Sequence, residues 1–495
     1  GHAEQAGGGL SAVQDARPSL ARQLVQVARC VQAVQAGRSL TTALPEVPGP
    51  LRPGVQALTF HALRHLGTAR ALLAVLADKP PPASVAALLC AALALLLPAD
   101  AASAVESGQD DATQPRYDAF TVVDQAVTAA RSVRGMAAQA GMVNACLRRF
   151  LREQSDLMAQ VDADWEARHN HPAWWVKRVR RDHPQHWQAV LAASQAAAPL
   201  VLRINQAQIS RDDYLHRLAE AGCDAHPIGP SGVVMARHVA VEGLPGYADG
   251  WFSVQDSAAQ LAAPLLLDGL NPAPGQRLRV LDACAAPGGK TAHLLERAQQ
   301  LGWAVDVLAL EVDAVRSQRI TDNLQRLRLP GQAVPAAGAC GKEADAAAGA
   351  ATSTAQVKVA DASDTAAWWD GQPFDAILLD APCTASGIVR RHPDVRWLRR
   401  ETDVAALADI QRRLLDALWP LLKPGGRMVY CTCSVFRAEG QAQVDAFVQR
   451  NTDARLGAAP GHLLPAGRGT GMHMTDNPGG ENDGFFYATL VRQTS

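Results

Sequence analysis

The feature that most constrains the fold of this chain is a regular alternation of strand-like and helix-like stretches in its C-terminal half. Six apolar runs in this half are typical of buried strands, and they lie at 277–283, 305–313, 357–361, 374–381, 426–433 and 484–492. Stretches with helical spacing lie between them, such as KTAHLLERAQQL and LADIQRRLLDALWPLL. This alternation predicts an α/β fold in which helices cover both faces of a mostly parallel sheet.

The rest of the chain shows two other patterns. Residues 10–155 are rich in alanine and leucine at helical spacing and contain no convincing alternating strand, so we expect an all-helical domain. Residues 160–250 combine a basic amphipathic stretch with short strand-like runs, which predicts a small α/β module. Residues 251–495 then form the last domain, and two or three domains are expected for a chain of 495 residues.

Several shorter segments limit the class of protein. The most apolar run, 85–97, has 13 residues, whereas a helix needs roughly 20 to cross a bilayer, so we expect a buried helix there. The N-terminal GHAEQAGGG lacks the basic-then-apolar order of a signal peptide. We interpret 99–117 as a polar loop and 335–356 as a low-complexity surface insertion. No membrane partner is expected.

The charge and the cysteines point to an intracellular protein without revealing its ligand. The formal net charge is −1, so any basic surface for a nucleic acid must be local. Nine cysteines at irregular spacings do not form a disulfide framework, and they fit reduced thiols. We therefore expect a cytoplasmic location.

The turn in RVLDACAAPGGKT, between a strand and a helix, is the first candidate binding site. Its small residues let a ligand approach the backbone, and the helix N-terminus offers free N–H groups. A P-loop would need glycine at the position of Cys284, and the dinucleotide pattern G-x-G-x-x-G is absent. A ligand with a carboxylate, an amine and a nucleoside remains, as in S-adenosylmethionine, and Glu311 after the next strand could accept hydrogen bonds from both ribose hydroxyls. An ordinary tight turn is the alternative.

Two cysteines stand out because each comes at the end of an apolar strand. Cys383 and Cys433 should open onto one crevice, since the carboxyl ends of parallel strands meet at one edge of a sheet. Cysteine is often only a small buried hydrophobic residue, which is the alternative for each of them. A zinc site that also includes Cys284 and Cys431 is a second alternative, but C-x-C is a poor start for zinc, and we expect no metal.

A methyl donor beside two thiols suggests methylation of a carbon that is not nucleophilic by itself, such as carbon 5 of a pyrimidine. A thiolate that adds to carbon 6 makes carbon 5 reactive, and a second thiol can assist the release of the product. A carboxylate near ring nitrogen 3 would hold the proton that stabilises the adduct, and Asp380 is suitably placed beside Cys383. The spacing does not decide which cysteine attacks.

Four motifs in this order, DACAAPGGKT, LLDAPCTASG, RRHPDVRW and YCTCS, resemble those of the RNA cytosine-5 methyltransferases. Within that family the chain resembles the ribosomal RNA small subunit methyltransferase B group, also called the Fmu or Sun group. Residues 10–155 are similar to the NusB-like RNA-binding domain of this group. The resemblance implies a Rossmann-like S-adenosylmethionine-dependent methyltransferase domain at 251–495, preceded by the NusB-like domain and by an RNA-binding linker module at 160–250.

The same resemblance implies an activity. The chain would transfer a methyl group from S-adenosylmethionine to carbon 5 of one cytidine in small-subunit (16S) ribosomal RNA, and S-adenosylhomocysteine would be the second product. The reaction would pass through a covalent cysteine–cytosine adduct. Apart from the resemblance, we expect the protein to be a monomer. A catalytically inactive RNA-binding protein with a relic methyltransferase domain is the alternative.

The resemblance further implies residue roles. Cys433 would be the nucleophile, Cys383 would help release the product, Asp380 would contact donor or base, and Lys290 would lie near the site. The turn would hold the methionine part of the donor, Glu311 the ribose, and Asp361 would lie by the adenine. The donor-binding candidates are therefore Cys284, Ala285, Ala286, Pro287, Gly288, Gly289, Lys290, Glu311, Asp361 and Asp380.

Two clusters of basic residues beside tryptophans are candidates for binding RNA. One follows Cys383 and includes Trp397, and the other lies in the stretch 174–187. Basic groups neutralise phosphates and aromatic rings stack on unpaired bases, whereas the alternative is a solvated charged face. The target base must leave its stack to be attacked. The RNA-binding candidates are Lys177, Arg178, Arg203, Arg390, Arg391 and Arg396.

Overall fold

The computed structural model describes residues 17–99, 115–334, 352–465 and 482–494. Most of the two predicted insertions, at 99–117 and 335–356, lies outside the described residues, as does the N-terminal GHAEQAGGG. The chain divides into two compact units, Gly1–Asn170 and His171–Ser495, and each is described on its own.

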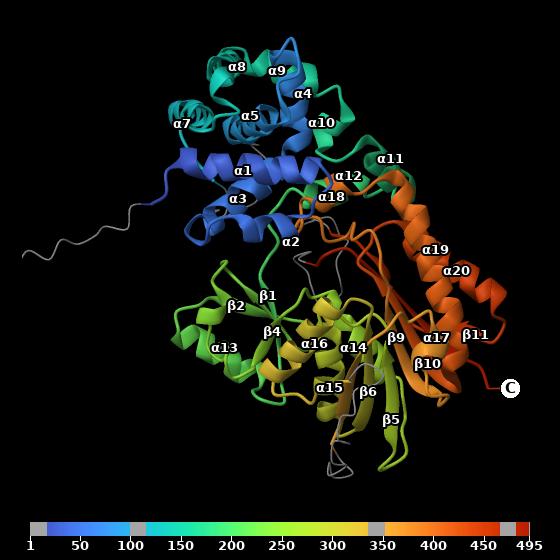
Figure 1. The fold of residues 1–495 in the computed structure, drawn as a ribbon. Coiled ribbons are helices and arrows are strands. Elements are labelled where there is room, and N and C mark those ends of the chain that lie inside the picture. The colour runs from blue at the N-terminus through green and yellow to red at the C-terminus, as the bar shows by residue number, and fades with distance from the viewer. Residues whose placement is uncertain (1–16, 100–114, 335–351, 466–481, 495) are drawn as a thin grey trace, which may run out of the picture. The chain divides into compact units, whose positions relative to one another are not determined.

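The first unit is a bundle of helices in the residues described, as the sequence predicts (Figure 1). Its helices are α1 (Leu20–Gln35), α2 (Leu40–Ala43), α3 (Arg52–Arg64), α4 (Leu66–Leu76), α5 (Ala83–Leu96), α7 (Ala119–Ser132), α8 (Ala140–Arg152), α9 (Gln154–Val161) and α10 (Trp165–His169). Helix α5 is the apolar run expected to be buried, and α1, α3, α4, α7 and α8 pack against it. Within the described ranges, no helix combines the length and the apolar character needed to cross a membrane.

The second unit begins with a small α/β module. Its helices are α11 (Ala173–Asp182), α12 (Trp187–Ala193) and α13 (Arg211–Glu220), and its strands are β1 (Val201–Ile204), β2 (Ala225–Ile228), β3 (Gly232–Met235) and β4 (Phe252–Val254). The four strands form an antiparallel sheet in the order β2-β3-β1-β4. Tyr214, Leu218 and Phe252 are fully buried in its core, so α13 covers one face of this sheet.

A nine-stranded sheet forms the centre of the second unit (Figure 1). Its strands are β5 (Arg277–Asp282), β6 (Ala304–Glu311), β7 (Gln332–Ala333), β8 (Thr354–Val359), β9 (Phe374–Asp380), β10 (Leu422–Thr432), β11 (Ala454–Leu456), β12 (Gly461–Leu463) and β13 (Phe485–Arg492). The order is β11-β13-β10-β9-β5-β6-β8-β7, and β12 pairs with β13. Strands β5 to β10 pair in parallel, whereas β13 runs antiparallel to β10.

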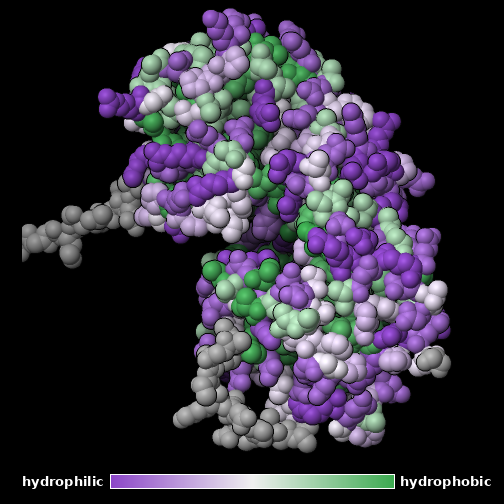
Figure 2. Space-filling view, turned by 45° about the vertical axis from the view of Figure 1, so that its right-hand side comes forward, coloured by the Kyte–Doolittle hydropathy of each residue, from purple (hydrophilic) through white to green (hydrophobic). Residues whose placement is uncertain are grey.

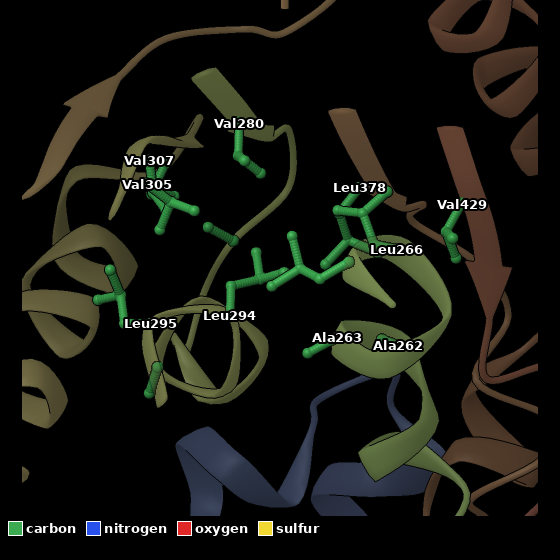
Figure 3. Packing of buried hydrophobic residues seen from close by; sticks show 14 of the residues in the cluster. Ala262, Ala263, Leu266, Val280, Leu294, Leu295, Val305, Val307, Leu378 and Val429 are labelled. Carbon is green, nitrogen blue, oxygen red and sulfur yellow. The ribbon is translucent and has the colours of Figure 1, made fainter. Parts of the chain in front are cut away.

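Helices cover both faces of this sheet. On one face lie α14 (Ala262–Leu267), α15 (Gly289–Leu301) and α16 (Ala314–Arg326), and on the other lie α17 (Thr365–Trp368), α19 (Glu401–Leu418) and α20 (Gln441–Arg450). Figure 3 shows Leu266 and Leu294 beside Val280 and Leu378 in the first of these layers. Val280 belongs to this layer, but its neighbour Leu281 belongs to the other, because successive side chains of a strand point to opposite faces. The predicted doubly covered α/β fold is confirmed.

The surface differs from these cores. On the face shown in Figure 2, hydrophilic residues cover much of each unit, and hydrophobic residues form smaller areas among them. Neither unit shows a broad apolar face in this view.

Candidate active site

The turn between β5 and α15 is fixed to both neighbouring strands. The backbone N–H of Ala283 donates to Leu378 O of β9 at 3.0 Å, and that of Ala285 donates to Leu310 O of β6 at 2.8 Å. Gly288 has φ +99°, and a Cβ there would lie 3.0 Å from the Cα of Ile320, so only glycine fits. The turn therefore holds the N-terminus of α15 at the carboxyl edge of the parallel strands, where such folds bind ligands.

Four acidic residues surround Cys284 at this edge. Asp282 ends β5, Glu311 ends β6, Asp380 ends β9, and Asp361 follows β8. Burial raises the pKa of the Cys284 thiol most, and the four carboxylates raise it further. Parallel strands thus place four carboxyl groups, from four separate segments, around one small turn. Such an edge is suited to a ligand that carries positive charge.

Asp282 is the most deeply buried of these acids. Its Oδ2 accepts a hydrogen bond from Thr291 Oγ1 at 2.6 Å, whereas its Oδ1 has no hydrogen-bond partner in the described part of the chain. Burial raises the pKa of Asp282 to about 7; Asp380 adds to this effect, and the Thr291 hydrogen bond opposes it. A buried acceptor without a partner is rare in proteins, and here a bound ligand could supply the missing donor.

Lys290, in the first turn of α15, pairs with Asp380. Its Nζ lies 2.7 Å from Asp380 Oδ2, and Cys431 Sγ donates to the other oxygen of Asp380 at 3.6 Å. Burial lowers the pKa of Lys290, but the charge and hydrogen bond of Asp380 outweigh it, and the pKa lies above the usual value. Lys290 therefore remains an ammonium group and fixes the carboxylate of Asp380 at the end of β9.

The two predicted thiols lie side by side. Cys383 follows β9 and Cys433 follows β10, and their Sγ atoms are 3.5 Å apart. The Cys383 Sγ also accepts a hydrogen bond from Ala385 N–H at 3.4 Å. The hydrogen bond with Cys433 raises the pKa of Cys383 well above its usual value, and burial adds to this effect. Cys383 therefore remains a protonated thiol beside Cys433.

Metal binding finds no support in this geometry. In the described ranges, no group of three or more histidine, cysteine, aspartate or glutamate residues is arranged to hold a metal ion. Cys431, which the zinc alternative would require, instead points its thiol at Asp380.

The RNA-binding candidates are placed very differently from one another. Arg203 is fully buried, and its Nε lies 2.9 Å from Glu296 Oε2. Arg396 is also fully buried and donates to Ser194 O at 2.9 Å. Both guanidinium groups join elements inside the second unit. Arg203 links the small module to α15, and Arg396 links its own helix, α18 (Val395–Leu398), to the end of α12. These placements speak against direct contact of either arginine with RNA.

Two further arginines belong to an internal cluster of charges. Arg390 and Arg391 bind the two oxygens of Asp483, at 2.6 and 2.5 Å, and Arg391 also lies 3.2 Å from Asp256. Arg390 is buried and Arg391 is half-buried, so this cluster ties the loop after Cys383 to the start of β13. Burial, followed by the nearby Asp483, raises the pKa of Asp256 to about 6. Arg390 is thus another candidate whose burial speaks against direct contact with RNA.

Helix α11 keeps the remaining two candidates closer to solvent. Lys177 is exposed, and Arg178 is half-buried with its guanidinium 5.8 Å from the centroid of the Phe436 ring. Trp175, on the same helix, is buried with its ring 5.2 Å from that of Phe436. The helix therefore packs its tryptophan onto the loop after Cys433 and leaves Lys177 available to a ligand.

Sequence reasoning missed one buried acid that contacts both cysteine loops. Glu439 is fully buried and accepts hydrogen bonds from Thr384 and Ser434, which directly follow the two thiols. The position of Glu439, six residues after Cys433, was the feature of the sequence that could have indicated this role. A charged residue in a polar segment is usually exposed, however, so the sequence did not predict that Glu439 is buried.

Comparison with protein families matches most of the second unit. A family model described as 16S rRNA methyltransferase RsmB/F matches residues 268–339 and 342–491. A second model, described as the ferredoxin-like domain of RsmF/B-like methyltransferases, matches residues 171–242. The two matched regions correspond to the nine-stranded sheet and to most of the small module.

Curated relatives and solved structures extend the similarity to nearly the whole chain. Ribosomal RNA small subunit methyltransferase B of Vibrio cholerae is 36% identical over 495 residues, which cover 98% of this chain and 99% of the relative. Its Xanthomonas campestris counterpart is 41% identical over 498 residues, with 98% and 100% covered. The crystal structure of PH0851 has a TM-score of 0.68 at 20% identity and covers 96% of this chain and 99% of its own. NSun6 from Pyrococcus horikoshii, solved with SFG, has a TM-score of 0.50 at 17% identity, with 66% and 99% covered. These two structures share the fold.

Proposed function

Because the chain belongs to the 16S rRNA methyltransferase RsmB/F family, we propose that it methylates carbon 5 of one cytidine in small-subunit ribosomal RNA through a covalent cysteine–cytosine adduct. Methyl transfer to small-subunit ribosomal RNA and dependence on S-adenosylmethionine follow from the family. The cytosine carbon and the adduct are our proposal. The observation that carries it is the distance of 3.5 Å between the thiols of Cys383 and Cys433, at the ends of two adjacent parallel strands.

The residues at the turn fit the methyl donor. S-adenosylmethionine, when bound, supplies an electrophilic methyl group on a sulfonium centre. The donor carries a positive sulfonium and a positive ammonium group, which suit an edge lined by four carboxyl groups. The unpaired Oδ1 of Asp282 can accept a hydrogen bond from an ammonium group. A nucleoside triphosphate would instead meet this negative edge with its own negative charges.

We assign parts of this site to parts of the donor. The turn 284–290 would hold the methionine portion, because its backbone lies at the N-terminus of α15. Glu311 would accept hydrogen bonds from the ribose hydroxyls, and it is held by Arg316, whose Nη1 lies 3.4 Å from Glu311 Oε1. Asp361, exposed after β8, would lie beside the adenine. The resemblance to the RNA cytosine-5 methyltransferases implies these roles.

Cys433 would perform the covalent step. Its thiolate forms a bond to carbon 6 of the cytosine, nitrogen 3 takes up the proton that the Cys433 thiol has given up, and carbon 5 becomes nucleophilic. Asp380 would accept a hydrogen bond from the N–H group at nitrogen 3 of the cytosine. The ion pair with Lys290 fixes the position of the Asp380 carboxylate. Cys433, and not Cys383, is taken as the nucleophile because the resemblance to the RNA cytosine-5 methyltransferases implies that role for it.

Cys383 would assist the second half of the reaction. After methylation, carbon 5 carries both a hydrogen and the new methyl group. Loss of that hydrogen as a proton to solvent re-forms the ring double bond and breaks the bond between Cys433 and carbon 6. The expelled thiolate takes back the proton from nitrogen 3. Cys383, at 3.5 Å from Cys433, is close enough to take part in this release. Two thiols thus suit a reaction that forms a covalent base adduct and then breaks it.

The other parts of the chain would hold the RNA. We propose that the helical region 10–155 is a NusB-like RNA-binding domain, that the module 160–250 contributes a second RNA contact, and that 251–495 is catalytic. The match of a ferredoxin-like domain model to residues 171–242 supports a separate module in the middle region. Lys177 is the candidate contact whose exposure agrees with this role.

Product analysis tests the proposed function. We expect the purified protein, with labelled S-adenosylmethionine and protein-free small-subunit ribosomal RNA, to produce 5-methylcytidine at one position, as measured by nucleoside mass spectrometry. Replacing Cys433→Ala should lower turnover by at least about a thousandfold, because the covalent route is lost. Cys223→Ala, in the small module, is the matched control and should keep normal turnover. Normal turnover in the Cys433→Ala protein would disprove the covalent mechanism.

A further inference from the structure

We infer that Glu439 is a positioning residue that fixes the two thiols of Cys383 and Cys433 relative to each other, an inference that rests on the proposed function. Glu439 ends the short 3-10 helix η7 (Arg437–Glu439), and its side chain is fully buried. A buried carboxylate is costly unless hydrogen bonds compensate for its lost hydration. Hydrogen bonds from Thr384, Ser434 and Gln411 compensate for the burial of this carboxylate.

The carboxylate binds the loops of both thiols at once. Thr384 directly follows the first thiol, and it donates its backbone N–H to Glu439 Oε1 at 2.8 Å and its hydroxyl to Oε2 at 2.6 Å. Ser434 directly follows the second thiol, and its hydroxyl donates to the same Oε2. Gln411 of α19 donates to Oε1 at 3.2 Å. A single side chain therefore joins the residue after each thiol.

The hydrogen bonds of the Glu439 side chain run from its partners to the carboxylate. Two N–H groups and two hydroxyls act as donors, and an ionised carboxylate can only accept. Ser434 gives its one hydroxyl proton to Glu439, while its oxygen accepts from Phe436 N–H at 3.0 Å. Ser386, whose oxygen lies 3.0 Å from that of Ser434, must then donate to Ser434. A chain of hydrogen bonds thus runs in one direction from the first loop, through the second, to the acid.

The backbone of the same residue ties the arrangement to the sheet. The carbonyl of Glu439 accepts from the Tyr430 hydroxyl at 2.7 Å and from the Thr432 hydroxyl at 3.4 Å, and both donors belong to β10. The two loops also meet directly, since Gly387 N–H donates to Cys433 O at 2.8 Å. The distance between the thiols is therefore set by a buried polar network, which tolerates few rearrangements.

An amide in place of the carboxylate would break this network without changing its shape. The backbone N–H of Thr384 cannot become an acceptor, so the amide oxygen of a Glu439→Gln side chain must take the Oε1 position. Its NH₂ group then faces the hydroxyls of Thr384 and Ser434, which previously donated there. Both hydroxyls would have to reverse, and Ser386 would lose the acceptor that it now uses. The loops would shift, although the volume of the side chain is unchanged.

Steady-state kinetics of the full-length Glu439→Gln protein tests this inference. We expect kcat to fall about a hundredfold, because a shift of about 1 Å between reacting groups has an effect of this size. The KM for ribosomal RNA and the Kd for S-adenosylhomocysteine, measured by calorimetry, should stay within about threefold of wild type. If Glu439 had a purely structural role, its substitution would lower the stability of the protein but would not lower kcat while KM stayed unchanged. Glu401→Gln, an exposed acid on α19, is the matched control and should match wild type.

The outcomes separate this inference from the proposed function. A folded Glu439→Gln protein with kcat within about threefold of wild type would overturn the positioning role. If that variant does not fold, Thr384→Val and Ser434→Ala each remove one hydroxyl donor, and each should lower kcat about tenfold; wild-type kcat in both would overturn the inference. Failure of the proposed function would instead be seen in the wild-type enzyme, which would form no 5-methylcytidine at all.

Discussion

The donor side and the thiol side of this site are built in opposite ways. On the donor side, which comprises the turn 284–290 and the acids around it, Asp282 has an oxygen without a partner and several carboxyl groups lie close together. On the thiol side, which comprises the two cysteine loops, the buried acid Glu439 has four donors on its two oxygens. The first arrangement is incomplete without a ligand, whereas the second is complete without one.

This difference follows the chemistry proposed for each side. A cationic donor must enter and leave in each cycle, and unsatisfied acceptors give it favourable contacts that the free protein lacks. The thiols must stay at a fixed separation through bond formation and bond breakage, and a satisfied network holds them there. The donor side lowers the stability of the free protein, because burying negative charge without a compensating partner costs free energy.

The largest expected effect concerns this destabilisation. The folded-state pKa of Asp282 is raised to about 7 from an ordinary 3.8, so the native protein binds more protons than the unfolded chain between these two values. Its contribution to stability therefore falls as the pH rises through that window, by about 1.4 kcal/mol per pH unit. Asp282→Asn removes this penalty and should stabilise the protein by about 3 kcal/mol more at pH 8 than at pH 5.

Chemical unfolding at the two pH values measures this difference. Asp322→Asn, on the exposed side of α16, is the control and should show no such dependence on pH. A gain from Asp282→Asn that is equal at pH 5 and pH 8 would mean that the pKa of Asp282 is not raised in the folded protein, so that the carboxyl group is ionised throughout this range. On the thiol side we expect the opposite sign, because Glu439→Gln removes a satisfied acceptor and should destabilise the protein.

A smaller effect concerns the ribose contact. Glu311→Gln keeps the size of the side chain but removes the charge, and a hydrogen bond to a charged group contributes about 1.5–3 kcal/mol. The Kd for S-adenosylhomocysteine should therefore rise about 10- to 100-fold, as measured by calorimetry. The affinity for ribosomal RNA should stay unchanged, because the substitution lies on the donor side. An unchanged Kd for S-adenosylhomocysteine would remove Glu311 from the donor site.

The sequence predicted the parts of this molecule that depend on local pattern. Alternating apolar runs predicted the parallel sheet, and the rule that carboxyl ends of parallel strands meet explains why Cys383 and Cys433 could be placed together from sequence. The turn with Gly288 was recognised because strand, small residues and helix follow one another directly. These features need only neighbours in the chain and one topological rule.

Long-range partners could not be predicted in this way. The arginines at 203 and 390 each bind an acid 93 positions away, Glu296 and Asp483, and no local pattern indicates such a pair. From sequence alone, a basic residue near an active-site loop is interpreted as an RNA contact. A buried acidic partner, as for Arg203 and Arg390, shows instead that the residue joins two parts of the protein. Glu439 was missed for the same reason, because its partners come from three separate segments.

The formation of the adduct itself tests the central claim most directly. RNA that contains 5-fluorocytidine at the target position cannot lose a proton from carbon 5, so the covalent intermediate should persist. We expect the wild-type protein, with S-adenosylmethionine, to form a stable protein–RNA complex in which peptide mass spectrometry finds the modified base on Cys433. The Cys383→Ala protein should accumulate the same complex even on ordinary cytidine. An adduct on Cys383 in the wild-type protein, or no adduct under conditions that give full methylation of ordinary RNA, would contradict the account.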